Sequence, residues 1–78
     1  MQKKVVGVNQ SLREVKKNNA QYVYIAKDAD KDVIDELVKC CEEQNIEIKY
    51  IDTKKELGKM ANVQVKVAAL TILKEGGE

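Results

Sequence analysis

Apolar residues recur along the chain in two periods, one helical and one extended. Val8, Leu12 and Val15 are spaced four and three apart, which predicts a helix over about residues 9–17 with these side chains on one face. Asn18 and Asn19 follow, and asparagine tolerates the turn conformations that end a helix. Residues 21–27 (QYVYIAK) are short, aromatic, β-branched and nearly continuously apolar, which is typical of a buried strand.

A second helix is predicted over about residues 31–44, with Asp30 as its N-cap. One arc of its helical wheel is apolar and the other is charged, so one face of this helix should pack on the core. The apolar arc consists of Val33, Ile34, Leu37, Val38, Cys40 and Cys41. The run DADKD before it (residues 28–32) is interpreted as a strand-to-helix loop with negative charge at a helix N-terminus, where such charge is favourable.

The last third of the chain predicts strand, helix and strand. Residues 46–51 (IEIKYI) alternate as a strand does. Thr53 and Glu56 fit a capping box, which opens a short helix to about Ala61. Asn62 can close that helix in the left-handed conformation. Residues 63–73 (VQVKVAALTIL) contain the last strand, and its apolar second half implies burial on both faces.

The order helix, strand, helix, strand, helix, strand predicts an α/β sandwich in which right-handed crossovers link strands of a mainly parallel or mixed sheet. We expect a single domain over residues 1–78, with its core at about residues 5–74 and a frayed tail at 75–78. In such sheets function gathers at loops at one end. Attention therefore falls on the start of the first helix and on the loop before the last strand.

Length and charge narrow the function. A chain of 78 residues buries only roughly 60–65 % of its unfolded surface, so a binding surface is expected rather than a deep pocket. Charged residues make up 35 % of the chain, and the net charge of +1 hides two opposed regions. Residues 28–47 carry eight acidic and two basic side chains, a balance of −6, which leaves +7 for the rest. That distribution suits a polyanion on one face, although charge runs can also simply solubilise helices.

The residues that enzymes and metal sites use are scarce. No histidine is present to act as a general base or to complete a zinc site, and no phosphate-cradling loop surrounds the isolated glycines Gly7 and Gly58. Cys40 and Cys41 are adjacent, which fits neither a redox pair nor zinc spacing, so two reduced thiols packed on a helix are expected. We predict that the protein is not an enzyme and has no cofactor and no metal.

No secretory signal follows Met1, and no apolar run approaches the ~18–20 residues that span a bilayer. A cytoplasmic protein without membrane contact is expected.

The first helix combines a core stripe with a polar arc. With Asn9 at zero on the wheel, Arg13 lies near 40° and Gln10 near 100°, about opposite the apolar residues. Amide side chains can address base edges, arginine forks onto guanine, and a helix N-terminus offers N–H groups to phosphate. The arc has the composition of a nucleic-acid reading edge, although Asn9 could be only an N-cap and the others solvated surface. Tyr22 and Tyr24 are more typical of core than of a stacking platform.

Three segments together resemble the kink-turn-binding ribosomal protein family of the archaeal L-seven-Ae type, and most of all its small stand-alone bacterial members. These are GVNQSLREVKKNNA, YIAKDAD and YIDTKKELGKMANVQVKVAALTIL. They carry the patterns G-x-[NK]-[EQ]-x-x-[KR], A-x-D-A and L-G-x-x-x-x-[IV]-x-V-x-x-A-A. The resemblance covers about residues 7–73.

The resemblance implies a three-layer α/β/α fold that binds kink-turn RNA. Its helix-start motif, which contacts tandem sheared G·A pairs, falls on Gly7, Asn9, Gln10 and Arg13. The loop that covers the flipped-out bulge nucleotide falls on Asn62, Val63, Gln64 and Val65. Val63 and Val65 would lie against a splayed base; otherwise they would need burial in the core. Lysines near both segments would attract phosphate: Lys16, Lys17, Lys54, Lys55 and Lys59.

Four positions depart from the archaeal pattern of that family. Gln10 replaces Glu, and Arg13 replaces Lys, which changes a point charge for a fork. Lys27 stands where Glu is frequent, and Asn62 stands where Gly is usual. The first two bear on affinity and on tolerance of variant kink-turns.

The sequence therefore predicts a monomeric, non-catalytic protein that stabilises kink-turn RNA, whether in ribosomal RNA, a riboswitch or another non-coding RNA. The alternative is a structural subunit of the ribosome or of another ribonucleoprotein that acts mainly through protein contacts of the acidic helix. A third possibility is a detached substrate-binding module of an RNA-modifying enzyme.

Overall fold

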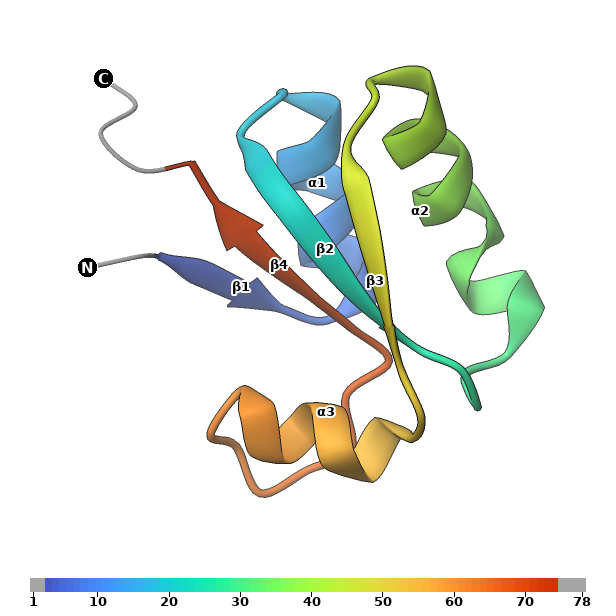
Figure 1. Cartoon of the computed structure of the whole chain (residues 1–78), viewed down its shortest axis with the longest axis vertical. Coiled ribbons are helices and arrows are strands. Elements are labelled where there is room, and N and C mark those ends of the chain that lie inside the picture. The colour runs from blue at the N-terminus through green and yellow to red at the C-terminus, as the bar shows by residue number, and fades with distance from the viewer. Residues whose placement is uncertain (1–2, 75–78) are drawn as a thin grey trace.

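A computed structural model describes residues 3–74, so the tail predicted at 75–78 lies outside the described residues. Within these residues three helices and four strands alternate (Figure 1). Their bounds are β1 (Lys4–Val6), α1 (Val8–Lys16), β2 (Ala20–Ala26), α2 (Lys31–Glu43), β3 (Glu47–Ile51), α3 (Lys54–Met60) and β4 (Ala69–Leu73). The helices begin and end within about a residue of the sequence prediction.

The strands form one mixed sheet in the order β1-β4-β2-β3. β2 and β3 are parallel, whereas β4 runs antiparallel to both β2 and β1. The sheet is thus of the mixed kind, and the expectation of mainly parallel strands is wrong for β4. β1 is a fourth strand that the sequence did not predict. Within the segment 63–73, which was predicted to contain the last strand, residues 63–68 form the loop and β4 begins at Ala69.

Helices lie on both sides of the sheet, as the three-layer prediction requires. α1 and α2 pack on one side over a core cluster that includes Val15, Val23 and Leu37. α3 packs on the other side over a cluster that includes Ala26, Leu57 and Leu70. In Figure 1 the sheet passes in front of α1, and α3 lies at its lower end.

The two cysteines are free thiols on α2, as predicted. Cys41 is fully buried in the first core cluster, and Cys40 is partly buried against it. Burial raises the pKa of the Cys41 thiol to about 11, with smaller contributions from Cys40 and Glu42. Cys41 therefore serves packing.

Candidate nucleic-acid interface

Gly7 fixes where α1 begins and how it meets the sheet. It is the N-cap residue with φ 106° and ψ 153°, a backbone conformation that favours glycine. Its N–H donates to the Ala69 carbonyl at the start of β4 (2.9 Å), and its own carbonyl accepts from Ser11 in the first helical turn (3.0 Å). Because Gly7 is the N-cap, Asn9 is already inside the helix, and the interpretation of Asn9 as a cap is wrong.

The polar arc of α1 is free to meet a partner. Val15 is fully buried, and Val8 and Leu12 pack against the same cluster, so the opposite arc turns to solvent. Asn9, Gln10 and Arg13 are all exposed. Within residues 3–74 none of these three side chains has a hydrogen-bond or ion-pair partner. We call these three residues the α1 edge.

The two lysines predicted with this edge lie at the other end of the helix. Lys16 and Lys17 close α1, about 12 Å from its first turn at 1.5 Å per residue. The Lys16 ammonium is 3.5 Å from the Glu36 carboxylate on α2, and both side chains are largely exposed. That pair is weak, but it directs Lys16 toward α2 and away from the α1 edge.

The loop after α3 returns across that helix before it enters β4. Asn62 has φ 61°, the predicted left-handed closure, and the N–H of Val63 donates to the Gly58 carbonyl (3.1 Å). Val63 is partly buried against the second core cluster, whereas Val65 is 68 % exposed. The sequence left two explanations for these valines, contact with a splayed base or burial in the core, and in the structure the two residues differ. Val63 packs on the core while part of it stays accessible, and Val65 is apolar surface.

Gly58 lets this loop lie directly on α3. A Cβ at Gly58 would overlap the carbonyl oxygen of Val65, and it would sit 3.4 Å from the Val65 carbonyl carbon. The obstacle is backbone, so no side-chain rotation could relieve it. Sequence reasoning considered Gly58 only as a possible phosphate-loop glycine and missed this close approach.

Asp28 holds the start of α3, and through it the end of the loop. The backbone N–H of Lys54 donates to Oδ1 of Asp28 (2.8 Å), and the Lys54 carbonyl accepts from the N–H of Val67 (3.2 Å). The charge of Asp28 thus stabilises the N-terminus of α3. The sequence predicted that the charge of DADKD lies at the start of the helix that follows it. That prediction is incomplete, because Asp28 accepts from the N–H of Lys54, 26 residues further along the chain, at the start of α3.

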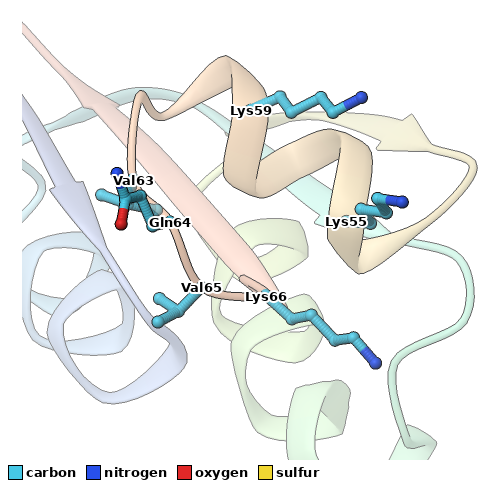
Figure 2. A pocket seen from close by; sticks show the side chains of 6 residues that line it. All are labelled: Lys55, Lys59, Val63, Gln64, Val65 and Lys66. Carbon is cyan, nitrogen blue, oxygen red and sulfur yellow. The ribbon is translucent and has the colours of Figure 1, made fainter.

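The helix and the loop enclose a shallow hollow of about 520 Å³, the basic hollow. Its lining residues are Lys55, Lys59, Val63, Gln64, Val65 and Lys66. Figure 2 shows the three lysine side chains extending toward one side of the view, whereas Val63, Gln64 and Val65 lie together on the loop. Lys66 was not predicted as a phosphate contact. Positive charge and apolar surface thus lie side by side.

Both halves of the site meet at one end of the sheet. The Gly7 to Ala69 hydrogen bond joins the start of α1 to the start of β4, only four residues beyond Val65. The sequence prediction that the first helix start and the loop before the last strand share one end is therefore confirmed for their backbone placement. The acidic side chains of α2, among them Asp32, Glu36 and Glu43, are exposed on a separate element.

Two further findings concern the part of the chain from residue 3 to residue 74. None of the helices there has the length and apolar character needed to cross a membrane. In the same stretch no three His, Cys, Asp or Glu side chains are grouped so that they could hold a metal ion.

Comparison with known proteins adds sequence and fold relatives. The sequence profile of the ribosomal protein L7Ae/L30e/S12e/Gadd45 family matches residues 1–78. The RNA-binding protein TTE2299 of Caldanaerobacter subterraneus is 47 % identical over 66 residues, which cover 85 % of this chain and 80 % of that protein. The RNA-binding protein YbxF of Geobacillus stearothermophilus is 36 % identical over 70 residues, which cover 90 % of this chain and 85 % of that protein.

Among solved structures, the 15.5kD RNA binding protein of Giardia lamblia superposes with a TM-score of 0.86 at 31 % identity. The match covers 94 % of this chain but only 62 % of the Giardia chain, so the present chain is similar to just under two thirds of that longer protein. A protein of unknown function from Bacillus halodurans shares the fold at 18 % identity, with a TM-score of 0.82.

Proposed function

Because the chain belongs to the ribosomal protein L7Ae/L30e/S12e/Gadd45 family, we propose that it is a non-catalytic RNA-binding protein that captures the bent form of kink-turn RNA. It acts as a monomer in the cytoplasm. Its partner is a structured RNA that carries a kink-turn, whether ribosomal RNA, a riboswitch or another non-coding RNA. The names of its relatives, which describe RNA-binding proteins, support the RNA part of this proposal.

The observation that carries the proposal is the α1 edge. Three exposed polar side chains without partners stand beside a helix start whose first N–H groups have no partners in the helix. Asn9 and Gln10 supply amide donors and acceptors to base edges, and Arg13 supplies a guanidinium fork for guanine. These groups suit the edges of sheared G·A pairs, and the free N–H groups suit a neighbouring phosphate.

The basic hollow supplies the second contact. The exposed Val65 offers an apolar surface to the sugar or the face of a nucleotide that leaves the stack, as unpaired RNA bases often do. Asn62 and Gln64 are exposed next to it and can bind polar edges of the same nucleotide. Lys55, Lys59 and Lys66 then neutralise phosphates on either side.

The mechanism is a shift of population. A kink-turn that is bent for part of the time is held bent, because the protein contacts both arms of that form and only one arm of the extended form. Gly7 and Gly58 matter here because they fix the spacing of the two contact surfaces before RNA binds. Preorganised surfaces lose less conformational entropy on binding.

A gel-shift titration at fixed moderate salt tests the proposal. One arm uses a kink-turn duplex, and the other uses the same duplex with its two sheared G·A pairs changed to Watson–Crick pairs. We expect a clear preference for the intact kink-turn. Equal, weak and salt-sensitive binding to both duplexes would contradict it, because that is the behaviour of non-specific phosphate binding.

The rival role is that of a structural ribonucleoprotein subunit that acts through protein contacts of α2. It is favoured only by the exposed acidic side chains of that helix. A pull-down after nuclease treatment separates the two roles. A protein partner that stays bound without RNA, together with no preference for the kink-turn, would replace our proposal with the rival.

A further inference from the structure

A large part of the sheet on the α3 side has no helix over it. α3 is only seven residues long and lies at one end of the sheet, so no helix covers the other end of that face (Figure 1). Strand register shows which residues share that end. Lys4 pairs with Ile72, Ile72 with Tyr22, and Tyr22 with Glu47, which places these four side chains in one row across all four strands. We call them the tyrosine row.

The next row toward α3 contains a second tyrosine and a second lysine. Tyr24 pairs with Lys49 on β3 and with Leu70 on β4, and it contacts the core cluster under α3. The Tyr22 and Tyr24 rings meet edge to face, with their centroids 5.4 Å apart. The Lys49 ammonium stands 4.5 Å from the Tyr22 ring centroid, as a cation over an aromatic face does.

Both tyrosines are only partly buried, and both lysines are exposed. The ring of Tyr22 therefore has Tyr24 at its edge and an exposed lysine over its face. An aromatic ring on an open sheet, with lysines beside it, is the arrangement by which proteins stack single-stranded bases while they bind the backbone.

We propose that the tyrosine row binds a single-stranded segment of RNA. One base stacks on the Tyr22 ring in place of the Lys49 ammonium, and Lys49 and Lys4 then pair with the phosphates on its two sides. Glu47 at the β3 end of the row accepts from a base N–H, such as the N3–H of uracil. This site is separate from the α1 edge and the basic hollow, and it does not depend on kink-turn recognition.

The small apolar area of this face favours RNA over a second copy of the chain. Ile72 is only 9 % exposed, so the accessible apolar surface of the row is essentially one tyrosine ring, whereas a stable dimer needs roughly 800 Å² from each partner. Phosphates can pair with Lys4 and Lys49, and a flat base can stack on the one aromatic ring, so a strand of RNA fits this face better.

The probe for this site is fluorescein-labelled hexauridine, which cannot form a kink-turn. Binding is followed by fluorescence anisotropy at low salt with wild type, Tyr22→Leu and Tyr50→Leu. Tyr50 is the matched control, because it is 52 % exposed and lies on the opposite face of β3 from its neighbour Lys49. Leucine keeps apolar bulk, and circular dichroism melts monitor the fold of each variant.

We expect Tyr22→Leu to weaken hexauridine binding by about 5- to 150-fold, the range for loss of one stacked base, and Tyr50→Leu to leave it unchanged. Lys49→Gln should reduce the dependence of affinity on salt. Arg13→Ala should not affect hexauridine, so failure of this site and failure of the kink-turn site give different results. Equal affinity of wild type and Tyr22→Leu, or no binding of wild type at about 0.1 mM, overturns the proposal. Sedimentation that shows a dimer lost in Tyr22→Leu overturns it in favour of self-association.

Discussion

Replacing Gly58 with alanine tests whether the contact between α3 and its loop sets the interface. The added methyl group would overlap the Val65 carbonyl oxygen, and the Val65 carbonyl carbon and the Lys66 Cα follow at 3.4 and 3.8 Å. Gly58 is buried in α3, so the methyl group cannot turn to solvent. The loop backbone must move away by a distance on the order of 1 Å, since unstrained Cβ contacts begin at 3.4 Å.

Two opposed effects set the size of the change in stability. Alanine favours a helix by about 1 kcal/mol over glycine. Overpacking a buried position costs about 1–3 kcal/mol, and the upper half of that range applies here because the obstacle is backbone. We therefore expect Gly58→Ala to lower the free energy of unfolding by about 1–2 kcal/mol. In a domain of this size each kcal/mol lowers Tm by about 4–8 °C.

The assay combines urea denaturation with kink-turn binding. Moving the loop displaces Val63 and Val65, so we expect affinity to fall while the folded fraction at the assay temperature stays near one. Amide chemical-shift changes should concentrate in α3 and residues 62–67. A variant that is more stable than wild type would refute the reasoning, since helix propensity alone would then account for the whole effect.

Four other changes test the remaining assignments. Arg13→Ala should weaken kink-turn binding by about 1–3 kcal/mol, the range for a lost base contact. Lys39→Ala on acidic α2 removes the same charge and should have little effect on binding. Gel shifts compare the two variants, and equal losses of affinity would mean that only net charge matters. Val65→Ser should lower affinity and leave stability within about 0.5 kcal/mol, as expected at an exposed position, and a matching loss in a urea titration would contradict this. Asp28→Ala should cost about 0.5–2 kcal/mol, as loss of a helix cap does, and an unchanged urea midpoint would show that its bond to α3 contributes nothing. The pKa of the Cys41 thiol is raised from 9.0 to about 11, so the thiol stays protonated to higher pH in the folded state than in the unfolded state. The free energy of unfolding should therefore fall as pH rises from 9 to 11. A Cys41→Ala variant with the same pH dependence of stability would exclude this thiol as the cause.

The helices were predictable because each carries its own periodic signal. Val8, Leu12 and Val15 define the core face of α1 without knowledge of anything else in the chain. The same wheel identified the exposed α1 edge. β1 carries no such signal, because three residues are too few to show alternation. It is a strand only because it pairs with β4, and β4 lies more than 60 residues away along the chain.

The antiparallel direction of β4 is related to the length of the helix before it, which the order of elements alone does not show. α2 has 13 residues and spans about 20 Å, enough to return along a strand and make β3 parallel to β2. α3 has seven residues and spans only about 10 Å, less than the ~17 Å of a five-residue strand. The helix alone is therefore too short to carry the chain back to the far end of the sheet, and the loop of residues 61–68 returns across α3 instead of extending in that direction. β4 therefore starts at the end where β3 stops, and it runs antiparallel.

The contacts that shape the interface are long-range, which is why the sequence pattern did not contain them. The difference between Val63 and Val65 depends on how the loop crosses α3, and that path depends on Gly58. The bond from Lys54 to Asp28 joins the first turn of α3 to the end of β2. An acidic residue in an acidic run gives no sign that its partner is a distant backbone N–H.

The separation of acidic and basic side chains favours approach of RNA to the α1 edge and the basic hollow from the same side of the protein. Residues 28–47 sum to −6 and the remainder of the chain to +7, so a phosphate backbone is repelled from α2 while it is drawn to the lysines of α3 and its loop. Lys16 is paired with Glu36 at the boundary between α1 and α2, which removes positive charge from the side of α1 that adjoins α2. We therefore expect RNA to approach the end of the sheet where the α1 edge and the basic hollow meet. Since both charge sets are exposed, this guidance acts over about a Debye length, 8 Å at physiological salt, and weakens as salt rises, whereas the proposed contacts of Asn9 and Val65 with RNA do not depend on it.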